Sequence, residues 1–127
     1  MPQTHVIFYQ EDENIAPVWD WLAQLRGENR DAFNKCWKAI ALLETMGHEL
    51  RRPHADILRD GIYELRIKFL QVNYRILYFF DGRTAAVLAC SFTKETKIPP
   101  VELNRAIARK NKYVEDREAH TFKGRKQ

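Results

Sequence analysis

The sequence predicts a single α+β domain in which a strand and two helices come first, three or four strands follow, and a helix closes the chain. Apolar residues recur at helical spacing in two stretches before Gly47 and then switch to a period of two. The chain has 127 residues, of which 45% are hydrophobic, which is typical of one domain with one core. We therefore assign residues 1–114 to one domain and residues 115–127 to a polar, flexible tail.

The N-terminal part predicts a strand followed by a helical hairpin. Residues 4–9 are β-branched and aromatic, and an acidic stretch ends them, as expected for a strand. Residues 15–27 carry an apolar stripe at helical spacing, and Pro17 is tolerated in a first helical turn. A second helix is expected from about residue 29 to Gly47, because the same kind of stripe continues there.

The middle of the chain predicts an antiparallel meander of three strands. Residues 51–56 form a polar connection, after which the odd positions of residues 62–69 are apolar and the even positions are charged. Residues 72–80 are more apolar, as in a central strand, and a hairpin turn and a third strand at 84–94 follow. Pro99-Pro100 suits the start of the last helix.

Basic charge is concentrated in one part of the chain. Residues 1–50 contain 4 Lys or Arg and 8 Asp or Glu, whereas residues 51–112 contain 13 and 6. Such clustering indicates a polyanionic partner, because lysines and arginines that neutralise phosphates release condensed counterions. A solvated surface that only aids solubility explains the charge equally well.

Several classes of protein and site lack their sequence signatures. No apolar run approaches the roughly 18 residues needed to cross a bilayer, and the N-terminus lacks a secretory pattern, so we expect a cytoplasmic protein without a membrane partner. Cys36 and Cys90 are expected to be buried thiols. We expect no metal and no cofactor, because neither a zinc signature nor a glycine-rich phosphate loop is present.

The candidate chemistry lies in basic residues of the predicted strands and their ends. These cations are Arg66, Arg75, Lys94 and Lys97, and they are joined by Glu64, Tyr63 and His54. Guanidinium groups stabilise the negative charge that develops when an RNA 2′-hydroxyl attacks its phosphate. A lysine whose pKa is lowered by neighbouring cations can protonate the leaving oxygen. Glu64 or Tyr63 is the candidate base.

Each candidate also has a purely structural explanation. Glu64 and Arg66 are two positions apart on one strand face, so they can be a surface ion pair. Lys94 and Lys97 can belong to an exposed turn, and His54 can be a solvated loop residue. Arg75 is harder to explain in this way, because a charge on so apolar a strand needs a partner or a ligand.

Three segments carry a resemblance to a known family. The sequence reads DGIYELR at residues 60–66, YRILYF at 74–79 and FTKETKIP at 92–99, and a helix with Glu102 and Ala106 follows. In this order the segments resemble the phage-derived, HigB-like branch of the RelE/ParE toxin superfamily. Relatives often carry His-Gly where this chain has Cys90-Ser91, and adjacent lysines where it has Lys94-Glu95.

The resemblance implies a RelE-like fold, in which an N-terminal strand and two-helix hairpin pack on a curved antiparallel sheet with a C-terminal helix. It also implies the toxin of a type II toxin–antitoxin pair, which cleaves ribosome-bound mRNA without a metal and is neutralised by a helix-turn-helix antitoxin. By position, the catalytic residues would be Glu64, Arg66, Arg75, Lys94 and Lys97. We expect RNA-binding side chains at Arg51, Arg52, His54, Tyr63, Lys68, Arg105 and Arg109.

Two alternatives remain open at this stage. The first is a toxin of the same fold that poisons DNA gyrase, as the ParE side of the superfamily does. The second is a non-catalytic, phage-derived binding module whose basic face only docks an acidic partner.

Overall fold

The computed structural model describes residues 3–94 and 97–124, and it has the α+β architecture that the sequence predicts. Its elements are β1 (His5–Phe8), α1 (Pro17–Glu28), α2 (Arg30–Met46), a short 3-10 helix (Gly47–Glu49), β2 (Ala55–Ile57), β3 (Tyr63–Phe69), β4 (Val72–Asp81), β5 (Ala85–Lys94) and α3 (Pro100–Glu115). Among the described residues, no helix combines the length and apolar character needed to span a membrane.

The five strands form one mixed sheet in the order β1-β5-β4-β3-β2. Strands β3, β4 and β5 make the antiparallel meander that the sequence predicts. The N-terminal strand joins the antiparallel strands by pairing in parallel with β5, which makes the sheet mixed. The polar connection expected at residues 51–56 is partly wrong, since β2 begins at Ala55 and pairs with β3. Strand β2 has only three residues, too few for a period of two to show.

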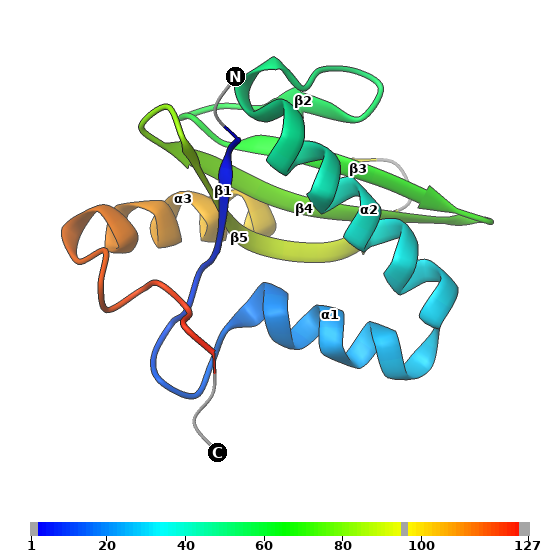
Figure 1. The fold of residues 1–127 in the computed structure, drawn as a ribbon, viewed down its shortest axis with the longest axis horizontal. Coiled ribbons are helices and arrows are strands. Elements are labelled where there is room, and N and C mark those ends of the chain that lie inside the picture. The colour runs from blue at the N-terminus through cyan, green and yellow to red at the C-terminus, as the bar shows by residue number, and fades with distance from the viewer. Residues whose placement is uncertain (1–2, 95–96, 125–127) are drawn as a thin grey trace.

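Helices cover both faces of the sheet (Figure 1). The α1–α2 hairpin packs on one face, where buried residues of the helices, such as Leu22 and Ile40, meet Leu65, Ile76 and Leu88 of the strands. Helix α3 packs on the other face, which has a core of its own. That second core includes Leu77, Phe79, Val87, Phe92, Ala106 and Tyr113.

Helix α3 covers only part of its face. Figure 1 shows α3 behind one half of the sheet, while the β3–β4 hairpin extends well past the end of the helix. Near the β3–β4 turn, side chains on the α3 side of the sheet are therefore not covered by α3. The same half of the sheet carries the arginines that the sequence singles out.

A β-bulge in β5 decides which side chains reach that face. In the register of β4 and β5, Leu77 pairs with Cys90 but Tyr78 pairs with Leu88, so Ala89 is an extra residue. Leu88 lies in the core beneath the α1–α2 hairpin (the hairpin-side core), whereas Ala89 and Cys90 both lie in the core on the α3 side. After the bulge, the residues of β5 that would otherwise face the α1–α2 hairpin face α3, and those that would face α3 face the hairpin.

The carbonyl group of the bulge residue is satisfied by Arg109 of α3. Its Nη1 donates to the Ala89 oxygen at 2.7 Å, and its guanidinium lies 5.7 Å from the ring centre of Tyr9. Only 18% of the Arg109 side chain is exposed. Burial also raises the pKa of the neighbouring Cys90 thiol to about 11, although Arg109 lowers it.

Replacing Arg109 by alanine is expected to lower the free energy of unfolding by about 1–3 kcal/mol, because the buried Ala89 carbonyl would lose its donor. Urea denaturation followed by circular dichroism measures the loss. Arg105→Ala is the matched control, since Arg105 lies on the same helix, is 46% exposed and pairs with Glu102 at the surface. Equal stability of the two variants would contradict this role of Arg109.

The segment after α3 lies along β1. The Phe122 N–H donates to the Phe8 oxygen at 2.9 Å, and the Gln10 N–H donates to the His120 oxygen at 3.0 Å. The Phe122 ring lies 5.2 Å from that of Trp19. The part of the predicted tail up to Phe122 thus has defined contacts with the domain.

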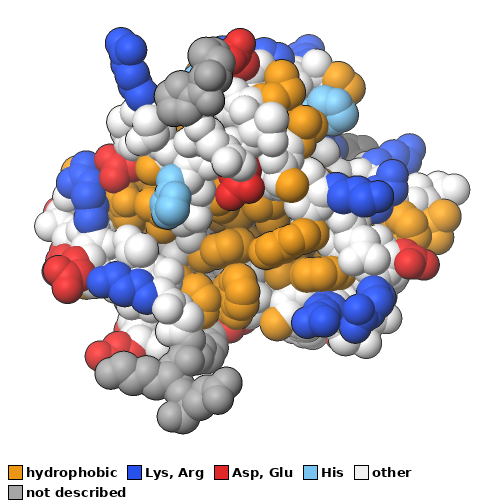
Figure 2. Space-filling model, in the orientation of Figure 1, with side chains coloured by type: hydrophobic (Ala, Val, Ile, Leu, Met, Phe, Trp, Pro, Cys, Tyr) orange, Lys and Arg blue, Asp and Glu red, His pale blue; other side chains and the backbone are white. Residues whose placement is uncertain are grey.

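The outer face of the α1–α2 hairpin is unusually apolar. Figure 2 shows hydrophobic side chains gathered across the middle of this face, with basic and acidic side chains on its rim. Trp19 and Trp37 are 38% and 43% exposed, and Ile15 is 48% exposed. Trp19 and Trp37 are therefore only partly buried in the core of the domain.

Candidate active site

The central strands place two arginines directly opposite each other. Arg66 of β3 and Arg75 of β4 are register partners, three positions from the hairpin turn. Their strand neighbours Leu65, Ile67 and Tyr74 pack in the hairpin-side core, so the arginines point to the α3 side. Like charges placed directly opposite each other in a sheet are destabilising. The pair therefore needs a compensating anion.

Glu64 supplies that anion from within the sheet. Its Oε1 accepts from Arg66 Nε at 2.9 Å, and its Oε2 accepts from Arg75 Nε at 2.9 Å. The Glu64 side chain is 1% exposed, compared with 11% for Arg75 and 33% for Arg66. One buried carboxylate thus fixes both guanidinium groups side by side.

A second carboxylate, Asp56 of β2, extends the network to the surface. It pairs in register with Glu64, and its Oδ2 accepts from Arg66 Nη2 at 3.3 Å and from Arg52 Nη2 at 2.7 Å. Hydrogen bonds from Arg52 lower the pKa of Asp56. We call Arg52, Asp56, Glu64, Arg66 and Arg75 the arginine cluster. Its three cations and two carboxylates leave one net positive charge.

The cluster keeps donor groups available for a ligand. Arg75 Nη1 donates to the backbone oxygen of Tyr74 at 3.1 Å, and Arg66 uses Nε and Nη2 for carboxylates. Within the described part of the chain, Arg66 Nη1 and Arg75 Nη2 have no hydrogen-bond partner. Two guanidinium groups held in this way can bind the oxygens of a phosphate group through charge-assisted hydrogen bonds.

Other predicted site residues lie near the cluster along the chain. Lys68 is exposed and follows Arg66 by two positions on β3, and the backbone oxygen of His54 accepts from the Arg66 N–H at 2.8 Å. Lys94 ends β5, where it pairs in register with Asn73, but its side chain lies outside the described residues. Lys97 is exposed in the segment between β5 and α3.

Four predicted residues have their contacts outside the arginine cluster. Tyr63 stacks on Tyr78 in the hairpin-side core, on the opposite face of the sheet from Glu64. Arg51 folds back on the oxygens of His48 and Leu50. Arg105 pairs with Glu102 on α3, and Arg109 holds the bulge. In the residues that the structure describes, no contact joins these side chains to Arg66 or Arg75.

Asp56 is a functional candidate that the sequence pattern does not indicate. It lies in the stretch assigned to a polar connection, where an aspartate is ordinary. The available signal was its spacing from Arg52, which at four positions suits an ion pair. Its contact with Arg66 depends on the pairing of β2 with β3, which the local sequence does not reveal.

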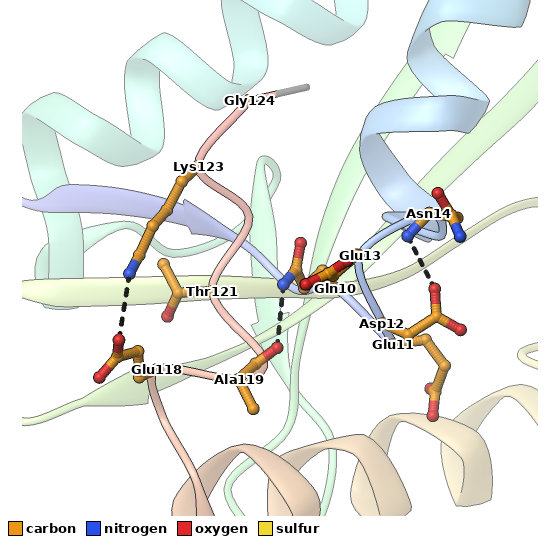
Figure 3. Close-up of a pocket in the computed structure, with 10 residues that line it drawn as sticks. All are labelled: Gln10, Glu11, Asp12, Glu13, Asn14, Glu118, Ala119, Thr121, Lys123 and Gly124. Carbon is orange, nitrogen blue, oxygen red and sulfur yellow. Dashed lines mark hydrogen bonds and ion pairs between the residues drawn. The ribbon is translucent and has the colours of Figure 1, made fainter. Parts of the chain in front are cut away.

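A hollow of about 730 Å³ lies elsewhere, between the β1–α1 loop and the segment after α3 (Figure 3). Its lining includes Glu11, Asp12, Glu13 and Glu118, and Lys123 points to Glu118 across 3.9 Å. Such an acidic lining repels phosphate. The hollow is therefore unsuited to the polyanion that the arginine cluster fits.

The comparison with protein families agrees with this arrangement. The family model described as phage-derived protein Gp49-like (DUF891) matches residues 20–111, which run from α1 into α3 and include the whole arginine cluster. None of the curated proteins matches the chain significantly. The chain therefore belongs to the phage-derived Gp49-like family, one of the RelE-like toxin families.

Proposed function

We propose that this protein is a HigB-like toxin of a type II toxin–antitoxin pair and an endoribonuclease that cleaves mRNA on the ribosome without a metal ion. The observation that carries the proposal is the cross-strand pair of Arg66 and Arg75 on the open half of the sheet. The single Glu64 carboxylate balances only one of these two positive charges. A phosphate group from RNA would balance the other.

The proposed reaction is an in-line attack of an RNA 2′-oxygen on the adjacent phosphorus. The 2′-hydroxyl gives its proton to a water molecule as the bond between phosphorus and the 2′-oxygen forms. The bond to the 5′-oxygen breaks, which leaves a 2′,3′-cyclic phosphate on one fragment and a 5′-hydroxyl on the other. Arg66 Nη1 and Arg75 Nη2 would donate to the non-bridging oxygens, whose negative charge grows in the transition state. Lys94 or Lys97 would bind phosphate or give its proton to the leaving 5′-oxygen.

In this proposal Glu64 orients the arginines and does not act as the base. Both of its carboxylate oxygens already accept from guanidinium groups. We assign it to positioning Arg66 and Arg75. Around the cluster, Arg52, His54 and Lys68 would contact the RNA backbone, and the cognate helix-turn-helix antitoxin would neutralise the toxin in the cytoplasm.

Induced expression followed by mapping of transcript 5′ ends tests this function. The wild-type chain is expected to arrest growth and to create new 5′ ends within translated regions, whereas Arg66→Ala is expected to do neither. Intact transcripts together with accumulating DNA breaks would favour a gyrase poison instead. A protein that neither cuts RNA nor breaks DNA, but still binds its partner, would be a non-catalytic module.

A further inference from the structure

The α1–α2 hairpin covers the face of the sheet opposite the arginine cluster, and its two helices form an apolar groove. Helices α1 and α2 diverge from their connecting turn toward β1 (Figure 1), and a groove of about 220 Å³ lies between them. The groove is lined by Trp19, Leu22, Ala23, Arg26, Phe33 and Trp37. Soluble monomers rarely expose contiguous apolar patches without a use for them.

The aromatic side chains of the groove support one another. The Phe8 ring of β1 lies 5.2 Å from Trp19 of α1 and 6.4 Å from Trp37 of α2, so it joins the two walls. Phe33 stacks on Trp37 at 5.8 Å. The walls are therefore preformed, so that few side chains of the groove lose conformational entropy when a ligand binds.

The size of the groove favours side chains of a partner over a small molecule. Sites for whole metabolites commonly enclose roughly 300–1,000 Å³, which exceeds the 220 Å³ available here. One or two apolar side chains on successive turns of a helix fit such a groove. Exposed tryptophans beside it are the residue type that most often dominates binding energy in protein interfaces.

The charge around the groove points to an acidic segment. Arg26 lines the groove and lies 5.9 Å from the Phe33 ring centre, and Arg30 shares a helix face with Phe33 and Trp37 by spacing. Neither arginine has a carboxylate partner among the residues that the structure describes. Basic and acidic side chains both border the apolar area in Figure 2, so the preference for an acidic segment rests on these two arginines.

RNA fits this face less well than protein. Residues 17–46, which comprise the hairpin, contain 4 Lys or Arg and 4 Asp or Glu, so they have no net charge to attract a polyanion. Phe8 and Phe33 both stack with Trp37, so this ring already has stacking partners within the protein and is less available to a base. The surplus of positive charge lies instead in residues 51–112.

We infer that the α1–α2 groove docks an amphipathic helix of a partner protein, with aliphatic side chains inserted between Trp19 and Trp37 and carboxylates paired with Arg26 and Arg30. This surface is distinct from the arginine cluster, and binding to it does not require RNA cleavage. The partner is thus recognised by an apolar stripe flanked by acidic residues on one side.

Two synthetic helices test the inference directly. Both have about 18 residues, a length that supports helix formation in water, and leucines at i, i+3, i+4 and i+7. One carries glutamates beside the leucines and the other carries lysines. Titration followed by the intrinsic tryptophan fluorescence of the full chain is expected to give at least about tenfold tighter binding of the glutamate helix, because only it complements the two arginines.

Substitutions in the groove test whether the synthetic helices bind there. Reversing both charges with Arg26→Glu and Arg30→Glu is expected to invert the preference between the two helices, and Trp37→Ser is expected to weaken both by about tenfold or more. Arg83→Glu in the exposed β4–β5 turn is the matched control, and far-ultraviolet circular dichroism checks the fold of each variant. RNA cleavage by the Arg26 and Arg30 variant should equal that of the wild type, which separates this inference from the proposed function.

Three results would overturn the inference. The first is equal or undetectable binding of the two helices by the wild-type chain. The second is a concentration-dependent dimer in sedimentation that Trp37→Ser abolishes, since the groove would then hold a second copy. The third is quenching of the tryptophans by single-stranded RNA that the same substitution removes, since the groove would then stack bases.

Discussion

Arg75→Ala is expected to slow RNA cleavage by about 10²–10³-fold, the usual effect of removing one preorganised donor from a developing oxyanion. Arg75 is 11% exposed, and Glu64 fixes its Nε, so its Nη2 is held in one position without solvent reorganisation. After the substitution Glu64 still pairs with Arg66, and the sheet retains its buried carboxylate in a compensated state. The measurement is single-turnover cleavage of mRNA in ribosomal complexes.

Two further variants sharpen this test. Arg83→Ala removes the same charge from an exposed turn and is expected to cleave like the wild type. Arg75→Lys keeps the charge but loses the planar fork, so it is expected to recover only part of the rate. Cleavage by Arg75→Ala within about threefold of the wild type would remove Arg75 from the proposed site, whatever the activity of the chain.

Glu64→Gln is expected to lower the free energy of unfolding by about 3 kcal/mol, the lower end of the cost of breaking a buried ion pair, because Arg66 remains a third exposed. The amide leaves two opposed guanidinium groups without the carboxylate between them. Urea denaturation of the purified chain measures the change.

A double variant distinguishes repulsion from lost packing. If uncompensated charge is the cause, adding Arg75→Met to Glu64→Gln should restore part of the stability, so that the two substitutions are not additive. Asp56→Asn serves as the comparison and should cost less, because the Asp56 side chain is 22% exposed and water can replace it. A Glu64→Gln chain as stable as the wild type would show that the bridging carboxylate is dispensable.

The sequence predicts those parts of the fold that local patterns encode. The alternation in β3 correctly separates Leu65 and Ile67 in the core from Glu64 and Arg66 on the other face. The parallel pairing of β1 with β5 has no local signature, because it depends on where the helical hairpin returns the chain. Three residues of β2 are likewise too few to show a period.

The sequence predicts the part of the arginine cluster that lies on the paired strands β3 and β4. Arg66, Arg75 and Glu64 meet as the alternation and the hairpin register suggest. Tyr63 is excluded from the same group by that alternation, and the structure places it on the opposite face. Arg109 resembles an exposed cation in the sequence, because the bulge carbonyl that it binds arises only when β5 pairs with β4.

Because Ala89 is an extra residue, the number of residues in β5 decides which side chains face α3, as much as their identity does. Phe92 reaches the α3 side only because the chain between the Asp81-Gly82 turn and Phe92 contains one residue more than regular pairing needs. Losing that residue would turn Phe92 toward the opposite layer without altering a single arginine. Homologous chains are therefore expected to vary in length in their loops, while the residue count along this strand stays fixed.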